Sequence, residues 1–237
     1  MGQDGGSVSA ATRPTRQRSF RNGAMSQELI ADSMEEVQSG LFRWEKYSTE
    51  HKVELTSHAI LRGASLVLFD PIDLREAACR SLLVRAKDAI VFLTSENHWR
   101  STDSWRGRGL SVITRTASGF RQAGVEGLSG EREAWNGFQV VPLAGGPAGE
   151  CVLIEPERRL GFGGDALVNL PGRGLEVLPA KYCTNQPALV DALGILATSE
   201  IEWLFPAHGR PIGPRAGELI KELLDREKKE AGAHDRT

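Results

Sequence analysis

The sequence predicts a protein of the α/β (α+β) class with mixed sheets, and two patterns support that fold class. A strand–helix–strand unit occupies residues 65–93, and a run of short strand candidates follows over residues 110–178. A helix, a strand and a terminal helix then complete the chain. Because a strand–helix–strand unit joins parallel strands, whereas hairpins join antiparallel ones, we expect both kinds of pairing.

The first predicted elements have clear periodicities. Residues 53–57 alternate between apolar or small and polar side chains, as expected for a half-buried strand. Segments 65–69 and 89–93 are almost wholly apolar, which indicates strands that are buried on both faces. Between them, Asp73 is the expected N-cap of a helix whose apolar residues share one face, namely Leu74, Ala78, Leu82 and Ala86.

The second half of the chain is richer in strand candidates. They cover residues 110–114, 138–143, 151–154, 159–162 and 175–178, the last two in hairpin-like succession. Pro187 is expected to open a helix with Leu189, Leu193 and Leu196 on one face. Residues 201–205 return as a buried strand, and an amphipathic helix from about Pro214 closes the chain.

Composition predicts one globular domain with an N-terminal tail. Residues 1–24 are rich in Gly, Ser and Arg and almost lack large apolar side chains. Such a segment buries too little apolar surface to offset its ordering entropy, so we expect it to be disordered. No second hydrophobic core follows a linker, and residues 25–237 are therefore expected to form a single domain.

The net charge limits the classes of partner that we expect, and the cysteine content indicates the cellular compartment. The net charge of −2 gives no sign of attraction to nucleic acid or to a membrane surface, and no apolar run approaches the roughly 20 residues that span a bilayer. The three cysteines (Cys79, Cys151 and Cys183) are odd in number and far apart, which argues against a disulfide framework. We expect a cytoplasmic protein. The sequence does not indicate its oligomeric state.

Four segments place chemically active side chains directly after predicted strands. They contain Asp70-Pro71, the stretch Thr94 to Arg100, Gly164-Asp165, and Ala207-His208-Gly209. In order and spacing, residues 53–212 resemble the metallo-β-lactamase family. The resemblance implies a four-layer αβ/βα sandwich, in which two mixed sheets pack face to face and helices cover the outer faces.

One loop departs from the family's pattern. Where the family has His-x-His-x-Asp-His, this chain has Ser95-Glu-Asn97-His98, and a loop two residues shorter puts Asn97-His98 in place of the Asp-His pair. The histidine that precedes the family's Thr-Pro-Gly turn is also absent from Gly145-Gly-Pro-Ala-Gly149. The chain thus resembles a degenerate branch of metal-dependent hydrolases. The resemblance implies at most one zinc, iron or manganese ion, held by His98, Asp165 and His208.

The same segments supply the candidate reactive residues. Asp165 and His98 are the candidate catalytic residues. Arg100 and Trp99 are the candidate substrate-binding residues, because a guanidinium at the mouth of a cleft can clamp the carboxylate or phosphate of a small anionic molecule. Two functions remain open: a hydrolase of esters, thioesters or phosphoesters with an eroded site, and a catalytically silent binding or regulatory protein that keeps the fold without the metal.

Overall fold

The computed structural model of the 237-residue chain describes residues 29–115, 124–128 and 133–234. The predicted tail (residues 1–24) lies outside these residues, and the single domain over residues 25–237 stays a prediction. No helix in the described ranges is long and apolar enough to cross a bilayer. All three cysteines are free thiols, as expected from their spacing.

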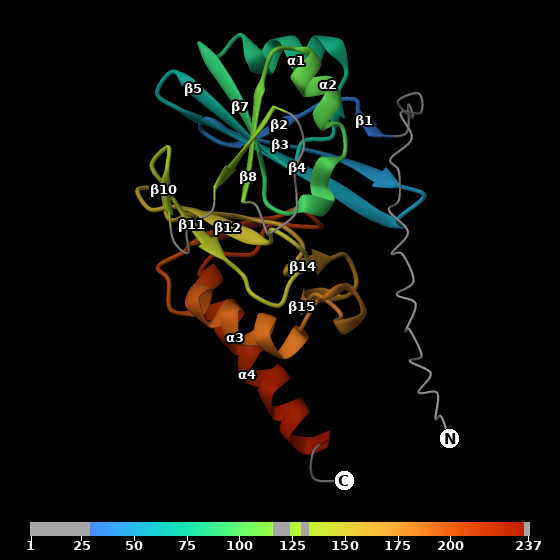
Figure 1. The fold of residues 1–237 in the computed structure, drawn as a ribbon, viewed down its shortest axis with the longest axis vertical. Helices are drawn as coiled ribbons and strands as arrows, with labels where there is room; N and C mark the ends of the chain where they lie inside the picture. The colour runs from blue at the N-terminus through green and yellow to red at the C-terminus, as the bar shows by residue number, and fades with distance from the viewer. Residues whose placement is uncertain (1–28, 116–123, 129–132, 235–237) are drawn as a thin grey trace, which may run out of the picture.

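Two β-sheets lie face to face between two pairs of helices (Figure 1). The larger sheet has seven strands, in the order β2 (Glu35–Gln38), β3 (Leu41–Ser48), β4 (Val53–Arg62), β5 (Ser65–Phe69), β7 (Asp88–Leu93), β8 (Ser111–Arg115) and β9 (Val125–Leu128). The smaller sheet has five, in the order β10 (Glu133–Trp135), β11 (Phe138–Pro142), β12 (Cys151–Glu155), β13 (Leu160–Gly163) and β16 (Trp203–Pro206). Both sheets contain parallel and antiparallel pairs.

Four helices and two small strand pairs complete the described fold. The helices are α1 (Glu76–Leu83), α2 (Thr102–Gly107), α3 (Gln186–Ala197) and α4 (Ala216–His234), with short 3-10 turns η2 (Glu96–Trp99) and η3 (Ala180–Tyr182). The strand pairs are β1 (Ile30–Ala31) with β6 (Asp73–Leu74), and the hairpin β14 (Leu167–Leu170) with β15 (Gly174–Val177).

Three apolar layers hold the sandwich together. Between the sheets, the ring of Phe69 from β5 stacks on Phe162 from β13, with centroids 4.1 Å apart. Trp105 of α2 is buried against the outer face of the larger sheet, and α3 and α4 bury Leu193 and Ile220 against the smaller one. Burying such faces is the main stabilising term in folding. The predicted four-layer sandwich with mixed sheets is therefore confirmed.

Some predicted boundaries were wrong for identifiable reasons. Helix α1 begins at Glu76 and not near Asp73, whose carboxylate instead accepts hydrogen bonds from Ser104 Oγ (2.6 Å) and Arg108 Nη2 (3.0 Å). The predicted hairpin of residues 159–162 and 175–178 does not form. β13 lies between β12 and β16, and β15 pairs with β14, a strand that the sequence did not predict.

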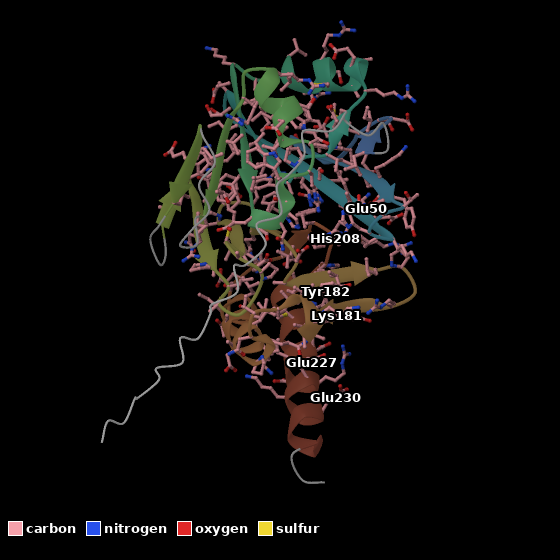
Figure 2. All side chains as sticks on the ribbon, turned by 45° about the vertical axis from the view of Figure 1, so that its right-hand side comes forward. Glu50, Lys181, Tyr182, His208, Glu227 and Glu230 are labelled. Carbon is pink, nitrogen blue, oxygen red and sulfur yellow. The ribbon has the colours of Figure 1, made fainter. Side chains whose placement is uncertain are left out.

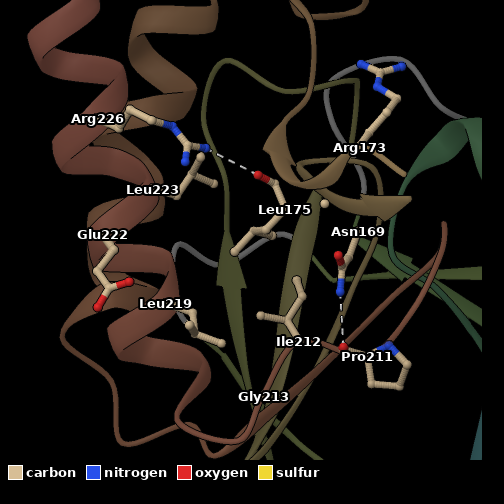
Figure 3. A pocket seen from close by; sticks show the side chains of 11 residues that line it. Asn169, Arg173, Leu175, Pro211, Ile212, Gly213, Leu219, Glu222, Leu223 and Arg226 are labelled. Atoms are coloured by element: carbon tan, nitrogen blue, oxygen red, sulfur yellow. Dashed lines mark hydrogen bonds between the residues drawn. The ribbon is translucent and has the colours of Figure 1, made fainter. Parts of the chain in front are cut away.

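The β14–β15 hairpin is tied to the loop after β16 and to α4. Asn169 Nδ2 donates to the carbonyl oxygen of Pro211 (3.2 Å), and Arg226 donates to that of Leu175 (3.4 Å), across a cavity of about 440 Å³ (Figure 3). Asn169 N also donates to the carbonyl oxygen of His208 at 3.3 Å. The hairpin therefore braces the backbone of a candidate site residue.

The buried His58 of β4 makes stability depend on pH. It lies between the sheets, 5.3 Å from the Phe205 ring, and burial lowers its pKa to about 3. The unfolded chain therefore binds one more proton than the native state between pH 6.5 and 3, so stability falls as pH falls below 6.5. We expect His58→Leu to reduce the slope of the unfolding free energy against pH by up to about 1.4 kcal/mol per pH unit. Urea unfolding from pH 7 to 5 measures it. His51→Leu, in the exposed β3–β4 turn, is the control, and an unchanged slope in His58→Leu would contradict the assignment.

Candidate metal centre

His98 is carried by the short turn η2, directly after β7. The side chain of Ser95 accepts a hydrogen bond from Asn97 N (3.4 Å), which caps this turn and directs the chain back over the strand end. His98 is only 3% exposed. Asn97 lies exposed at the edge of the site.

Asp165 and His208 follow two neighbouring parallel strands of the smaller sheet, β13 and β16. The turn of Asp165 requires the glycine before it, because a Cβ on Gly164 would stand 2.7 Å from Thr94 Oγ1. The buried Glu150 carboxylate accepts a hydrogen bond from Ala166 N (2.9 Å) and fixes the other side of that turn. Parallel strands end at the same edge of a sheet, which brings both side chains together.

The three predicted ligands converge on one point. Asp165 Oδ1 lies 2.9 Å from His98 Nε2 and 3.0 Å from His208 Nε2. One ligand atom from each of the three residues lies within 4.8 Å of the others. Among the described residues, this is the one group of three or more His, Cys, Asp or Glu side chains with that geometry. Three ligands of one ion need donor atoms within about 4–5 Å of each other, and the structure meets this condition.

Each imidazole is held at its other nitrogen. His98 Nδ1 lies 3.0 Å from Asp70 Oδ2, and His208 Nδ1 lies 2.9 Å from the carbonyl oxygen of Glu54. Asp70 is itself fixed by Thr94, whose backbone N–H (2.8 Å) and hydroxyl both donate to its carboxylate. An acceptor at Nδ1 keeps a proton there and leaves Nε2 available as a ligand.

Without a metal, this cluster is an alternating chain of carboxylates and imidazoles. Burial alone would lower the pKa of His98, but the carboxylates of Asp165 and Asp70 outweigh it and raise that pKa to about 10. Burial would likewise raise the pKa of Asp165, yet the neighbouring His98 and His208 hold it well below its usual range. Asp165 is therefore ionised at neutral pH, the state in which a carboxylate binds a cation.

The donor set fits a divalent transition metal. Two imidazole nitrogens and one carboxylate, converging from three strand ends, are a ligand set used by catalytic zinc, which keeps a further position for water or substrate. The Nδ1 acceptors, Asp70 and the Glu54 carbonyl, are the partners that usually orient such ligands. The cluster is also satisfied as a network of ion pairs, so geometry alone is compatible with both functions left open by the sequence.

Arg100 lies beside the centre, but its guanidinium is largely engaged with the backbone. Nη1 donates to the carbonyl oxygens of Thr56 and Asp70, both at 2.9 Å, and Nη2 donates to that of Ala207 at 3.2 Å. These bonds join β4, the end of β5 and the strand end that carries His208. The expected role of Arg100 as an anion clamp stays a prediction, and its contacts are those of a residue that positions the site.

Trp99 lies outside the cleft above the centre. Its Nε1 donates to Asp103 Oδ2 at 3.0 Å, and the Arg106 guanidinium carbon lies 5.8 Å from the centre of its ring. The side chain also packs against the apolar cluster between the larger sheet and helices α1 and α2. The structure thus separates Trp99 from the other predicted site residues, because η2 turns consecutive side chains in different directions.

The cleft has a volume of about 490 Å³, within the range of pockets that bind small molecules. In Figure 2, His208 lies between the β3–β4 turn, marked by Glu50, and the segment with Lys181 and Tyr182. The floor contains Asn97, His98, Arg100, Asp165 and His208, and the walls come from that turn, the β14–β15 hairpin and η3. A small molecule in this cleft would lie directly over the three converging side chains.

Two residues that matter to the site, Asp70 and Glu150, were not among the predicted site residues, although Asp70 belongs to one of the segments that carry the family resemblance. Asp70 follows β5 as His98 follows the parallel neighbour β7, and the register Phe69↔Phe92 puts both strand ends at one edge. The parallel pairing of these two predicted strands could therefore have indicated that Asp70 lies beside His98. No sequence signal pointed to Glu150, because a glutamate before a strand is common. Only the structure shows that its side chain is buried against the Asp165 turn.

Comparison with solved structures finds one fold repeatedly. VMB-1 has a TM-score of 0.66 at 10% identity, covering 83% of this chain and 97% of that one. DIM-1 metallo-β-lactamase has a TM-score of 0.65 at 15% identity, covering 82% and 97%. A metallo-β-lactamase family protein from Thermus thermophilus has a TM-score of 0.59 at 15% identity, covering 84% and 81%. No protein-family model matches the chain, and neither does any curated protein. At these identities the likenesses bear on the fold alone.

Proposed function

The chain has the metallo-β-lactamase fold, and we propose that it is a metal-dependent hydrolase of esters, thioesters or phosphoesters with a single-ion centre. The observation that carries the proposal is the convergence of His98 Nε2 and His208 Nε2 on Asp165 Oδ1, with both imidazoles oriented at Nδ1. A structural ion pair needs one such contact, whereas three ligands aimed at one point suit a cation.

In this proposal each residue has a distinct task. His98, Asp165 and His208 would hold one zinc, iron or manganese ion, and such an ion would supply Lewis-acid polarisation of the scissile carbonyl or phosphoryl group and a lower pKa for a water molecule. Asp70 keeps the proton on His98 Nδ1. Arg100 acts by position, because it fixes the Ala207 carbonyl next to His208.

A single ion implies moderate activity. The described residues contain no second group of three or more His, Cys, Asp or Glu side chains that converge in this way. One cation cannot stabilise both the attacking and the leaving oxygen, as a pair of ions does. We therefore expect slower turnover than in two-metal hydrolases.

The second function is a silent binding protein that keeps the cleft. Its support is the completeness of the ion-pair network, in which Asp165 is satisfied by two imidazoles without any cation. Protein dialysed against zinc, iron and manganese separates the two. A hydrolase gains metal, thermal stability and activity towards 4-nitrophenyl esters together, whereas a silent protein gains none of them.

Replacing Asp70 by asparagine tests the orientation of His98. The amide has the shape of the carboxylate but loses the charge that keeps a proton on Nδ1. Loss of such outer partners typically lowers metal affinity or activity by about 10- to 100-fold. We expect that loss in competition titrations with a zinc chelator, with the fold intact by circular dichroism. Unchanged affinity would show that Asp70 serves only the packing of Thr94.

A further inference from the structure

The walls of the cleft are apolar on both sides of the candidate metal centre. The β4 side supplies Val53 and Leu55, and the opposite side supplies Val168, Leu170, Leu178 and Pro179. These residues come from three separate segments, so the apolar lining is a property of the assembled cleft. Burying a hydrocarbon chain there would contribute roughly 25 cal/mol per Å² of apolar surface.

An exposed aromatic side chain marks the mouth of the cleft. Tyr182 lines the cleft and is 59% exposed, one of three large apolar or aromatic side chains in the described residues with such exposure. The ammonium of Lys181 lies 4.7 Å from the centre of its ring. Figure 2 shows both residues below His208, on the side opposite the β3–β4 turn. The apolar path therefore continues outwards from the centre.

Among the described lysines and arginines that line the cleft, one side chain has neither an ion-pair partner nor a hydrogen bond to a backbone carbonyl. Lys52 lies exposed in the β3–β4 turn and lines the cleft. The other two lining cations are engaged: Arg173 pairs with Glu176, and Arg100 with backbone carbonyls. Asp165, the carboxylate in the lining, lies between two imidazoles. The unpaired charge among the lining residues is therefore the positive charge of Lys52.

We propose that the substrate is an ester or thioester with an apolar acyl chain whose far end carries an anionic group. This inference rests on the proposed hydrolase function. The scissile carbonyl lies over His98, Asp165 and His208, the chain follows the apolar wall, and the anion meets the Lys52 ammonium. Water adds to the carbonyl carbon and the bond from the acyl carbon to the leaving oxygen or sulfur breaks, which releases a carboxylic acid and an alcohol or thiol.

A matched pair of probes tests the anionic end. 4-Nitrophenyl octanoate and mono-4-nitrophenyl suberate share the leaving group and the acyl chain length, and differ by a terminal carboxylate. An exposed charge pair contributes about 0.2–1 kcal/mol, which predicts a kcat/KM for the suberate ester that is higher by a factor of roughly 1.4 to 5, through a lower KM. Since exposed charges are screened, the preference should fall in about 0.5 M salt. We also expect kcat/KM for 4-nitrophenyl octanoate to exceed that for 4-nitrophenyl acetate by more than about tenfold, because the longer acyl chain buries more apolar surface.

Two variants assign the preference to Lys52. Lys52→Gln should make kcat/KM for the two eight-carbon esters equal, with the metal content at its wild-type value. Lys87→Gln removes the same charge from an exposed position before β7, at the opposite end of that strand from His98, and should keep the preference.

The outcomes separate this inference from the function on which it rests. Bound metal and hydrolysis of octanoate, with no preference for suberate or with a preference that survives in Lys52→Gln, would overturn the substrate class and leave the hydrolase proposal standing. Absence of both metal and hydrolysis would overturn the two together. A preference lost in Lys52→Gln and kept in Lys87→Gln supports the inference.

Discussion

Asp165→Asn is expected to abolish metal binding and to reduce ester hydrolysis by more than about 100-fold. Removal of an outer partner alone reduces metal affinity or activity by roughly 10- to 100-fold, so the loss of a direct ligand exceeds that range. Asp165 is also the residue on which both imidazoles converge, at 2.9 and 3.0 Å. Its neutral amide cannot replace the negative charge that attracts a cation.

Metal content by elemental analysis and initial rates on 4-nitrophenyl octanoate measure this effect. Asp191→Asn makes the same chemical change on the exposed face of α3 and is expected to behave as wild type. Circular dichroism confirms that the variant is folded. Wild-type metal content in folded Asp165→Asn would exclude Asp165 as a ligand.

Arg100→Ala is expected to destabilise the protein by about 3 kcal/mol or more. The substitution removes three hydrogen bonds from a charged donor, and hydrogen bonds to charged groups contribute about 1.5–3 kcal/mol each before relaxation. It also frees the carbonyl of Ala207, next to His208, so metal affinity should fall as well. This outcome differs from that of a residue that only binds substrate, whose loss would raise KM and leave stability unchanged.

Urea unfolding of metal-free protein measures the stability difference. Arg100→Lys should recover part of the loss, because one ammonium cannot reach all three carbonyls. Arg210→Ala, an exposed arginine two residues after His208, is the matched control and is expected to stay within about 0.5 kcal/mol of wild type. A stable Arg100→Ala with a raised KM for anionic esters would return Arg100 to the role expected from the sequence.

The strand–helix–strand unit was predictable because its strands are buried on both faces. Residues 65–69 became β5 with the predicted bounds, and residues 89–93 lie within β7. The β14–β15 hairpin was missed because β14 is short and its stability comes from contacts far along the chain, such as those between Asn169 and the segment after His208. Such long-range pairing leaves no local periodicity.

The meeting of His98, Asp165 and His208 could be predicted because the order and spacing of the segments resemble the metallo-β-lactamase family, and because each residue follows a strand end. The orientation of side chains within a turn could not. Trp99 and Arg100 both follow His98 in the sequence. Trp99 nevertheless packs on the outer face of the larger sheet, whereas Arg100 donates hydrogen bonds to three backbone carbonyls. The backbone of Arg100 has a φ of 37°, a conformation that no local pattern indicated.

Elemental analysis of protein purified without chelators, and again after dialysis against zinc, iron and manganese, tests the central claim most directly. The structure offers one group of three converging ligands in the described part of the chain, so we expect one tightly held ion per chain. The same preparation of Asp165→Asn should contain none. A wild-type chain that remains metal-free after dialysis against all three ions would contradict the account and leave the silent binding protein as the function of this fold.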